Sequence, residues 1–338
     1  MPFTMEFGTG FETGATNGPL RSGIFSQGGA VMGTGANKHT GTYAIDCTSL
    51  SRFWKVAGLP PAGEKYLSLW AKVSSEALCS LAIQFQDAAA AVLVDLRRYG
   101  TKLDAYVGAN LVANGVVDFD AASFHHIQIH VLIADGAAGV IETIIDGIPD
   151  IVYNGDTKPG ASTNIEQVQL LVLNNTTGFY ADDFCFGAGG WPGDIRFDPV
   201  LLSADSAPLD WTPSTPGTHW SLIDETPPVS ADYVYALTDV SDRYETPGTW
   251  DDTDGMGNVV KDPIAVTVWA DVRKQDGNTN DKLQISQKVG ANEVVGGYET
   301  LLTSYENRWL MRVLAPDAAE WTLAKVNALI VGIDADMA

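Results

Sequence analysis

Two histidines, His126 and His130, have a spacing that could place one metal ion between them. On an α-helix, residues four apart share a face, so both imidazoles could reach the same ion. The surrounding residues instead alternate between apolar and polar side chains, which predicts a β-strand in which four residues span about 13 Å. As strand neighbours, His125 and His126 would point to opposite faces. The sequence therefore predicts histidines that face solvent or stack on a sheet, and no metal site.

Two pairs of carboxylates have the residue types that glycoside hydrolysis needs. A retaining glycosidase holds its two carboxyl groups about 5–5.5 Å apart. Glu142 and Asp146 share a strand face but would lie about 13 Å apart, and Asp146 belongs to an Asp-Gly turn. Asp182 and Asp183 are neighbours in a predicted strand and would face opposite ways. No catalytic residues are predicted, and the chain is expected not to be an enzyme.

A polar turn with oxygen ligands at alternate positions, Asp276, Asn278 and Asn280, resembles the start of a calcium loop. The sixth position is Asp281 rather than Gly, and the twelfth is Gln287 rather than Glu. We therefore expect a solvated hairpin tip, with calcium as the weaker alternative, and no other cofactor.

Large aromatic rings gather in a weakly periodic, acidic segment. Amphipathic rings in loops suit sugar stacking or a protein interface, and burial within the chain's own domain is the alternative. The candidate interface residues are Trp211, Trp220, Tyr233, Tyr235, Tyr244 and Trp250.

Composition limits the class of protein. The 338 residues include 42 Asp and Glu but 20 Lys and Arg, a net charge of −22 that argues against binding nucleic acid. No apolar run is long enough for a membrane span, and no signal peptide is visible. The three cysteines form no CxxC pair and are expected to be reduced. The 34 Gly and 16 Pro residues are typical of a turn-rich β protein.

The segment 124–153 shows the clearest strand pattern. Its alternating residues are separated by Asp135-Gly136 and Asp146-Gly147, and Asp-Gly between β-branched runs is a strong hairpin signal. We predict a three-stranded antiparallel meander with no helix and with five buried side chains, namely those of Ile127, Ile129, Val131, Ile141 and Ile145.

Further strands are predicted on both sides of a glycine-rich boundary at 187–193. The fold class is all-β, with two β-sandwich domains of the jelly-roll type at 1–190 and 191–338. The segment 198–262 is expected to hold long connections with few strands, and one short helix is predicted from Pro316 to Leu329. Other predicted strands are 66–73, 81–87, 92–99, 102–107, 167–173, 180–186, 264–272, 282–289 and 309–314.

Five segments of the first domain carry a resemblance to a known fold, namely Phe7–Gly14, Ser68–Lys72, His126–Val131, Glu142–Gly147 and Tyr180–Phe184. Together they are similar to concanavalin A-like and laminin-G-like lectin sandwiches. Phe124-His125-His126 stands where that strand usually has Trp-His, and no sugar-binding or calcium-binding motif of the family is evident. The resemblance implies the fold and not lectin activity.

A second, diffuse resemblance covers nearly the whole chain. It runs through Asp182–Phe184, Gly193–Leu201, Trp211–Ser214, Trp220–Pro228, Pro316–Asp317 and Glu320–Leu329. This series resembles virion structural proteins of tailed bacteriophages, and it implies a non-enzymatic virion component assembled in the host cytoplasm and released by lysis.

Within that class, a tail-associated fibre or adhesin is expected first and a capsid decoration protein or head fibre second. A glycan-binding lectin or a glycoside hydrolase is the less favoured alternative. The expected partners are other virion proteins, copies of the chain itself and a host surface glycan, with neither nucleic acid nor membrane insertion. The aromatic segment between Trp211 and Trp250 is expected to lose accessible surface on assembly.

Overall fold

The computed structural model describes residues 4–9, 25–28, 31–33, 39, 44–47, 53–74, 81–173, 178–195, 197, 200–223, 232–248, 263, 265–275, 281–303 and 306–337. The chain divides into two compact units, the first ending at residue 198. The described part of the second unit lies between residues 200 and 337.

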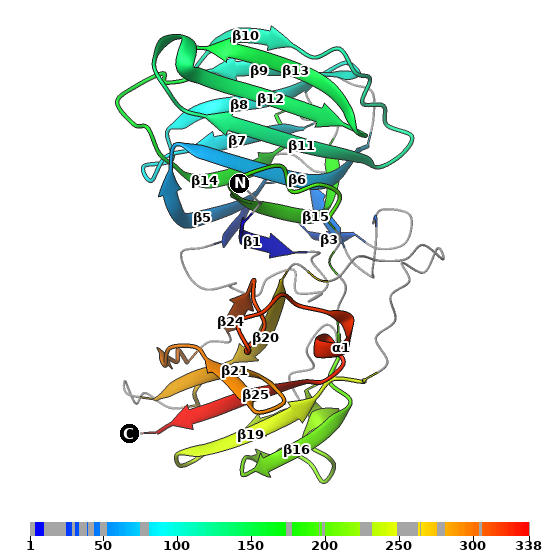
Figure 1. The fold of residues 1–338 in the computed structure, drawn as a ribbon, viewed down its shortest axis with the longest axis vertical. Coiled ribbons are helices and arrows are strands. Elements are labelled where there is room, and N and C mark those ends of the chain that lie inside the picture. The colour runs from blue at the N-terminus through cyan, green and yellow to red at the C-terminus, as the bar shows by residue number, and fades with distance from the viewer. Residues whose placement is uncertain are drawn as a thin grey trace. The chain divides into compact units, whose positions relative to one another are not determined.

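The first unit consists of two antiparallel sheets, which form the layers of a sandwich (Figure 1). The eight-stranded sheet has the order β13 (Ile148–Gly155), β12 (Gly139–Ile145), β11 (His125–Leu132), β6 (Glu64–Val73), β15 (Phe179–Ala188), β4 (Ala44–Cys47) and β3 (Val31–Gly33), with β1 (Thr4–Thr9) also paired to β15. The seven-stranded sheet has the order β10 (Asn110–Asn114), β9 (Lys102–Val107), β8 (Val92–Tyr99), β7 (Ala82–Gln86), β14 (Ile165–Leu171), β5 (Phe53–Ala62) and β2 (Phe25–Gly28).

The predicted meander is confirmed as β11, β12 and β13. Its five predicted core side chains are fully buried between the two sheets. The turn between β12 and β13 has positive φ at both central residues, 50° at Asp146 and 79° at Gly147, as an Asp-Gly hairpin turn requires. At the other turn, Asp135 stays extended and a single 3₁₀ turn follows at Gly136–Ala138, so the expectation of no helix in this segment was wrong at that one turn.

The second unit is built around an antiparallel sheet with the order β16 (Ala204–Leu209), β19 (Val240–Glu245), β25 (Leu329–Asp336), β21 (Lys282–Val289) and β22 (Asn292–Val295), with β23 (Glu299–Thr300) beside β21. A ribbon of β20 (Val266–Val272) and β24 (Glu306–Arg312) shares its core through Val268 and Leu310. A short pair, β17 (Thr212–Pro213) and β18 (Val234–Tyr235), and a 3₁₀ turn at Trp220–Leu222 complete the described elements.

The helix predicted for this unit is present, but its predicted bounds were wrong. The helix expected from Pro316 to Leu329 is the single turn α1 (Leu323–Val326), capped by the Thr322 side chain. Leu329 instead begins β25, whose alternate residues Leu329, Val331 and Ile333 point into the core. The segment 198–262 was expected to hold long connections with few strands, and its described residues hold two six-residue strands, β16 and β19, and the two-residue pair β17 and β18. One of these, β19, lies directly beside the central strand β25.

The predicted all-β fold class, with a short helix near the C-terminus, is confirmed. None of the helices in the described ranges has the length and apolar character needed to span a bilayer.

Candidate functional site

A row of polar side chains crosses the outer face of the seven-stranded sheet. Tyr106, Asp95, Gln84, Gln169 and Lys55 lie opposite one another in the pairing of β9, β8, β7, β14 and β5. The alternate residues of these strands are apolar and buried in the sandwich core, so strand alternation directs the row outward. We call this surface the glutamine face, and define it as Lys55, Gln84, Gln86, Asp95, Arg97, Tyr99, Tyr106, Gln167 and Gln169.

Hydrogen bonds between neighbouring strands hold the side chains of the glutamine face in place. Gln86 Nε2 donates to Gln84 Oε1 at 3.0 Å and to Gln169 Oε1 at 2.9 Å. Asp95 Oδ2 accepts from Gln84 Nε2 at 3.2 Å and from Arg97 Nε at 2.7 Å. Because these contacts fix several rotamers in advance, a ligand would meet an ordered surface.

Three acceptor atoms on this face have no hydrogen-bond partner among the residues that the structure describes. They are Gln86 Oε1, Gln167 Oε1 and Asp95 Oδ1. Their side chains belong to residues that are only 3%, 7% and 0% exposed. A buried acceptor without a donor is unfavourable by about 1–3 kcal/mol, and native structures hold few of them. All three atoms are themselves buried, so the accessible polar groups of this face are those of its half-buried residues, which include Gln84, Gln169 and Tyr106.

The charged groups of the face respond to burial in opposite directions. Burial raises the pKa of the Asp95 carboxyl, against the lowering effect of the hydrogen bond from Arg97. Burial lowers the pKa of the Lys55 ammonium. Burial, helped by Tyr99, also raises the pKa of the Tyr106 hydroxyl, whose ring lies under the Arg97 guanidinium at 4.3 Å.

The signal for this face in the sequence is a repeated Gln-x-Gln. Gln84-Phe85-Gln86 and Gln167-Val168-Gln169 each place two amides on one side of a strand. The sequence analysis missed the site because nothing local shows that these two strands are neighbours.

The outer face of the eight-stranded sheet is covered by the chain's own segment 191–195, which we call the strap. The Ser68 hydroxyl donates to Gly193 O at 3.1 Å, Trp70 Nε1 donates to Asp194 Oδ1 at 3.0 Å, and Gly193 N donates to Gln128 Oε1. The strap thus covers part of the outer face of this sheet.

A serine and a histidine meet beneath the strap, with Ser68 Oγ 2.8 Å from His126 Nε2. Since the Ser68 hydroxyl proton goes to Gly193 O, the His126 ring is the donor in this pair. A general base would have to accept the serine proton, and Ser68 is fully buried. The pair therefore holds the strap in place and has the wrong polarity for a nucleophile.

His130 lies between two carboxylates, 3.0 Å from Glu64 Oε1 through Nε2 and 2.9 Å from Glu142 Oε2 through Nδ1. Its ring stacks on Tyr66 with centroids 4.3 Å apart. Of the two expected positions for the histidines, facing solvent or stacking on the sheet, His130 takes the second. Burial and the Glu64 carboxylate raise the pKa of Tyr66 to about 12.

The geometry corrects one carboxylate prediction. A bulge in β15 and a φ of 46° at Asp183 bring Asp182 and Asp183 to the same residue, His39, instead of opposite faces. Asp182 Oδ2 accepts from His39 N at 2.9 Å, and Asp183 Oδ2 lies 3.0 Å from His39 Nδ1. Asp146 stays with its turn and accepts from the backbone N–H of His126.

No group of three or more potential metal ligands occurs among the residues with described positions. The calcium candidates Asp276, Asn278 and Asn280 lie outside the described residues.

The candidate interface aromatics have different surroundings. Tyr244 is buried in the core of its own unit, where its hydroxyl donates to Asp242 Oδ2 at 2.8 Å. Trp211 and Trp220 are half-buried against the same core. Tyr233 and Tyr235 are 43% and 37% exposed. Trp250 lies outside the described residues.

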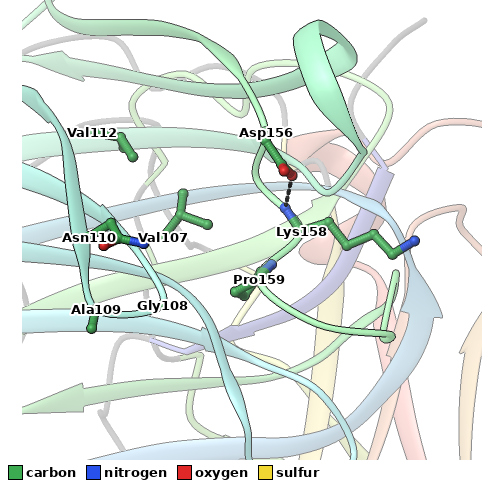
Figure 2. A pocket seen from close by; sticks show the side chains of 8 residues that line it. All are labelled: Val107, Gly108, Ala109, Asn110, Val112, Asp156, Lys158 and Pro159. Carbon is green, nitrogen blue, oxygen red and sulfur yellow. Dashed lines mark hydrogen bonds between the residues drawn. The ribbon is translucent and has the colours of Figure 1, made fainter.

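A hollow of about 320 Å³ lies where the β9–β10 hairpin meets the segment after β13 (Figure 2). Its lining is Val107, Gly108, Ala109, Asn110, Val112, Asp156, Lys158 and Pro159. The Asp156 carboxylate accepts from the backbone N–H of Lys158, which closes the local turn. It shares no residue with the glutamine face.

No family model and no curated protein sequence matches this chain. Solved structures do match in fold. An endo-β-1,4-glucuronan lyase from the fungus Trichoderma reesei is 10% identical with a TM-score of 0.42, over 55% of this chain and 96% of that one. The alginate lyase Aly36B is 12% identical with a TM-score of 0.36, over 57% and 98%. A carbohydrate esterase from the Shiga toxin-encoding bacteriophage phi24B is 14% identical with a TM-score of 0.38, over 56% and 100%.

These comparisons correct the functional expectation. The expectation that the chain is a non-enzymatic structural component of a virion was wrong, because the similar structures include polysaccharide lyases and a carbohydrate esterase. A phage occurs among them only as the source of the esterase, and none confirms a virion role or a laminin-G-like domain. The likeness concerns the sandwich fold, so function is argued below from the glutamine face.

Proposed function

We propose that the first unit binds a carbohydrate chain on the glutamine face. The observation that carries this proposal is the ordered row of half-buried polar side chains, with Gln84 and Gln169 at its centre, that crosses five neighbouring strands. Sugar hydroxyl groups both donate and accept hydrogen bonds, and they occur in closely spaced sets that match side-chain amides.

The shape of the surface supports an extended ligand. The row from Tyr106 to Lys55 crosses five neighbouring strands, which at about 4.8 Å per strand spacing is about 19 Å. That length accommodates several sugar rings. Tyr99 and Tyr106, with ring centroids 6.4 Å apart, supply apolar surface at one end of the row.

Binding of oligosaccharides to the full chain tests the proposal. A panel of neutral and acidic oligosaccharides would be titrated calorimetrically into the wild type, Gln84→Leu and Gln169→Leu. Losing a hydrogen bond to one of these half-buried amides is expected to weaken binding about five- to tenfold. Gln128→Leu is the matched control, because Gln128 lies on the opposite sheet and bonds the strap. Failure of the whole panel to bind, or equal effects of all three variants, would refute the proposal.

A further inference from the structure

We infer that the outer face of the eight-stranded sheet carries a second ligand site, which binds the ammonium group of an amine-bearing saccharide. Glu64, Glu142 and Trp191 form this site around the ring of His130, and we call it the His130 site. It lies on the opposite sheet from the glutamine face, so it is independent of the carbohydrate binding proposed there.

The first step is a count of the protons around His130. Its Nε2 lies 3.0 Å from Glu64 Oε1, and its Nδ1 lies 2.9 Å from Glu142 Oε2. Each contact is a hydrogen bond that needs one proton, so the three groups share two protons. Two carboxylates and one imidazole that hold two protons have a net charge of −1, on whichever atoms the protons reside. A ligand group with one positive charge complements them.

The second step is access to this charge. The Glu64 and Glu142 side chains are 46% and 35% exposed, whereas the His130 side chain between them is 10% exposed. The contacts with His130 use one oxygen atom of each carboxylate, Glu64 Oε1 and Glu142 Oε2. A ligand in solution can therefore reach both carboxylates without displacing the ring that holds them.

The third step is the aromatic ring beside the carboxylates. Trp191 lies perpendicular to Tyr66 and His130, with ring centroids 5.6 Å and 6.0 Å away, and it is 37% exposed. An exposed indole attracts a cation and packs against the apolar side of a sugar ring. Together, the indole and the net negative charge favour a sugar that bears an ammonium group and disfavour a uronic acid.

A second histidine between two carboxylates lacks these properties. His125 lies 2.6 Å from Asp146 Oδ2 and 3.3 Å from Asp120 Oδ1. Both of these carboxylates also accept backbone N–H groups, which engages them in local turns. The ring that packs on His125 belongs to Phe119, which is fully buried. Asp120 is therefore a matched control for the carboxylates of the His130 site.

The test compares an amino sugar chain with its neutral form. The full chain is titrated calorimetrically with the tetramer of glucosamine and with the tetramer of N-acetylglucosamine, at low ionic strength. The amine form should bind about three- to fivefold more tightly, as expected for one partly exposed charge pair. Glu64→Gln and Glu142→Gln each keep an acceptor for His130 but remove one charge, so each should abolish this preference. Asp120→Asn removes the same charge elsewhere and should preserve it, which separates the site from the attraction of the whole acidic chain.

The remaining outcomes locate the site and its ligand class. Gln84→Leu, on the glutamine face, should leave the preference for the amine form unchanged, and Trp191→Leu should weaken binding of both tetramers. Equal binding of the two tetramers by the wild type would overturn the inference, as would a preference that persists in both Glu→Gln variants. A lysine tetramer that binds as tightly as the glucosamine tetramer, in a manner that depends on Glu64, would overturn the saccharide assignment.

Zero-length cross-linking gives a readout that needs no affinity. A carbodiimide takes up the water that is lost when a ligand amine and a carboxylate form an amide. With the glucosamine tetramer, peptide mass spectrometry should find the sugar on Glu64 or Glu142 in excess over Asp120, although Asp120 is the most exposed of the three at 52%. Modification of Asp120 to the same extent or more would contradict the inference.

Discussion

His126 Nε2 lies 2.8 Å from Ser68 Oγ, directly under the strap residue whose carbonyl accepts the Ser68 proton. This relationship ties the segment just before the end of the first unit to the middle of β6 and β11. The glycine-rich stretch expected as a plain boundary is therefore anchored to a sheet by side-chain hydrogen bonds.

Acidification should loosen the strap. Burial lowers the pKa of His126 from its ordinary 6.5, outweighing the opposite effect of Asp194 and Asp146. Because the folded-state pKa lies below the unfolded one, the stabilisation is present above about pH 6.5 and is lost as the pH falls through the folded value. Hydrogen exchange of residues 191–195, corrected for intrinsic rates, should rise at mildly acidic pH.

The control for this effect is a non-titrating side chain at the same place. His126→Gln keeps a donor for Ser68 and should flatten the pH dependence of exchange in the strap. His125→Gln, on the opposite face of β11, should leave it unchanged. A wild-type strap whose exchange is independent of pH would contradict the prediction.

Asp95 should make the protein less stable as the pH rises from about 4. Its pKa is raised above 3.8 by burial, so the folded state binds the proton more tightly than the unfolded state does. The contribution of Asp95 to the free energy of unfolding therefore falls as the pH rises from the unfolded-state pKa to the folded-state pKa. Above the folded-state pKa this contribution is constant. The difference between wild type and Asp95→Asn in chemical unfolding, measured across this range, should show that slope, and a flat difference would exclude the raised pKa.

Adjacent residues on β11 should differ sharply in their effect on stability. Ile129 is fully buried between the sheets, so Ile129→Ala should reduce the free energy of unfolding by about 2–5 kcal/mol. Gln128→Ala removes the acceptor for Gly193 N and should mainly raise hydrogen exchange in the strap. Equal losses of stability from both variants would contradict the assignment of their faces.

Local patterns in the sequence were sufficient to predict the strands of the first unit. The alternation around Ile127 and Ile129, and the Asp-Gly turn at Asp146, specify a hairpin without knowledge of the rest of the chain. The end of the second unit shows the limit of this reasoning. Val326 and Leu329 are both buried, but one belongs to a single helical turn and the other to a central strand.

The candidate site depended on pairings that no local pattern contains. Gln84 and Gln169 come together because β7 pairs with β14, and Lys55 joins them through β5. Glu64 likewise reaches His130 only because β6 pairs with β11. Asp183 turned out on the same side as Asp182 because a bulge with positive φ breaks the alternation that the prediction assumed.

The aromatic segment of the second unit provides the last prediction. Asp242 is fully buried and accepts from the Tyr244 hydroxyl at 2.8 Å, from His219 Nδ1 at 2.6 Å and from the backbone N–H of Trp211. Tyr244→Phe would leave this carboxylate short of a donor in a buried place, so the free energy of unfolding should fall by about 1–3 kcal/mol. Tyr235→Phe is the matched control, since Tyr235 is exposed and should tolerate the change. Hydrogen exchange in β19 would report on this unit separately from the first. Equal exchange in both variants would show that the Tyr244 hydroxyl does not stabilise the unit.

Loss of accessible surface at Trp211 and Trp220 on assembly stays a prediction. Quenching of their fluorescence, compared between the free chain and any oligomer, would measure it.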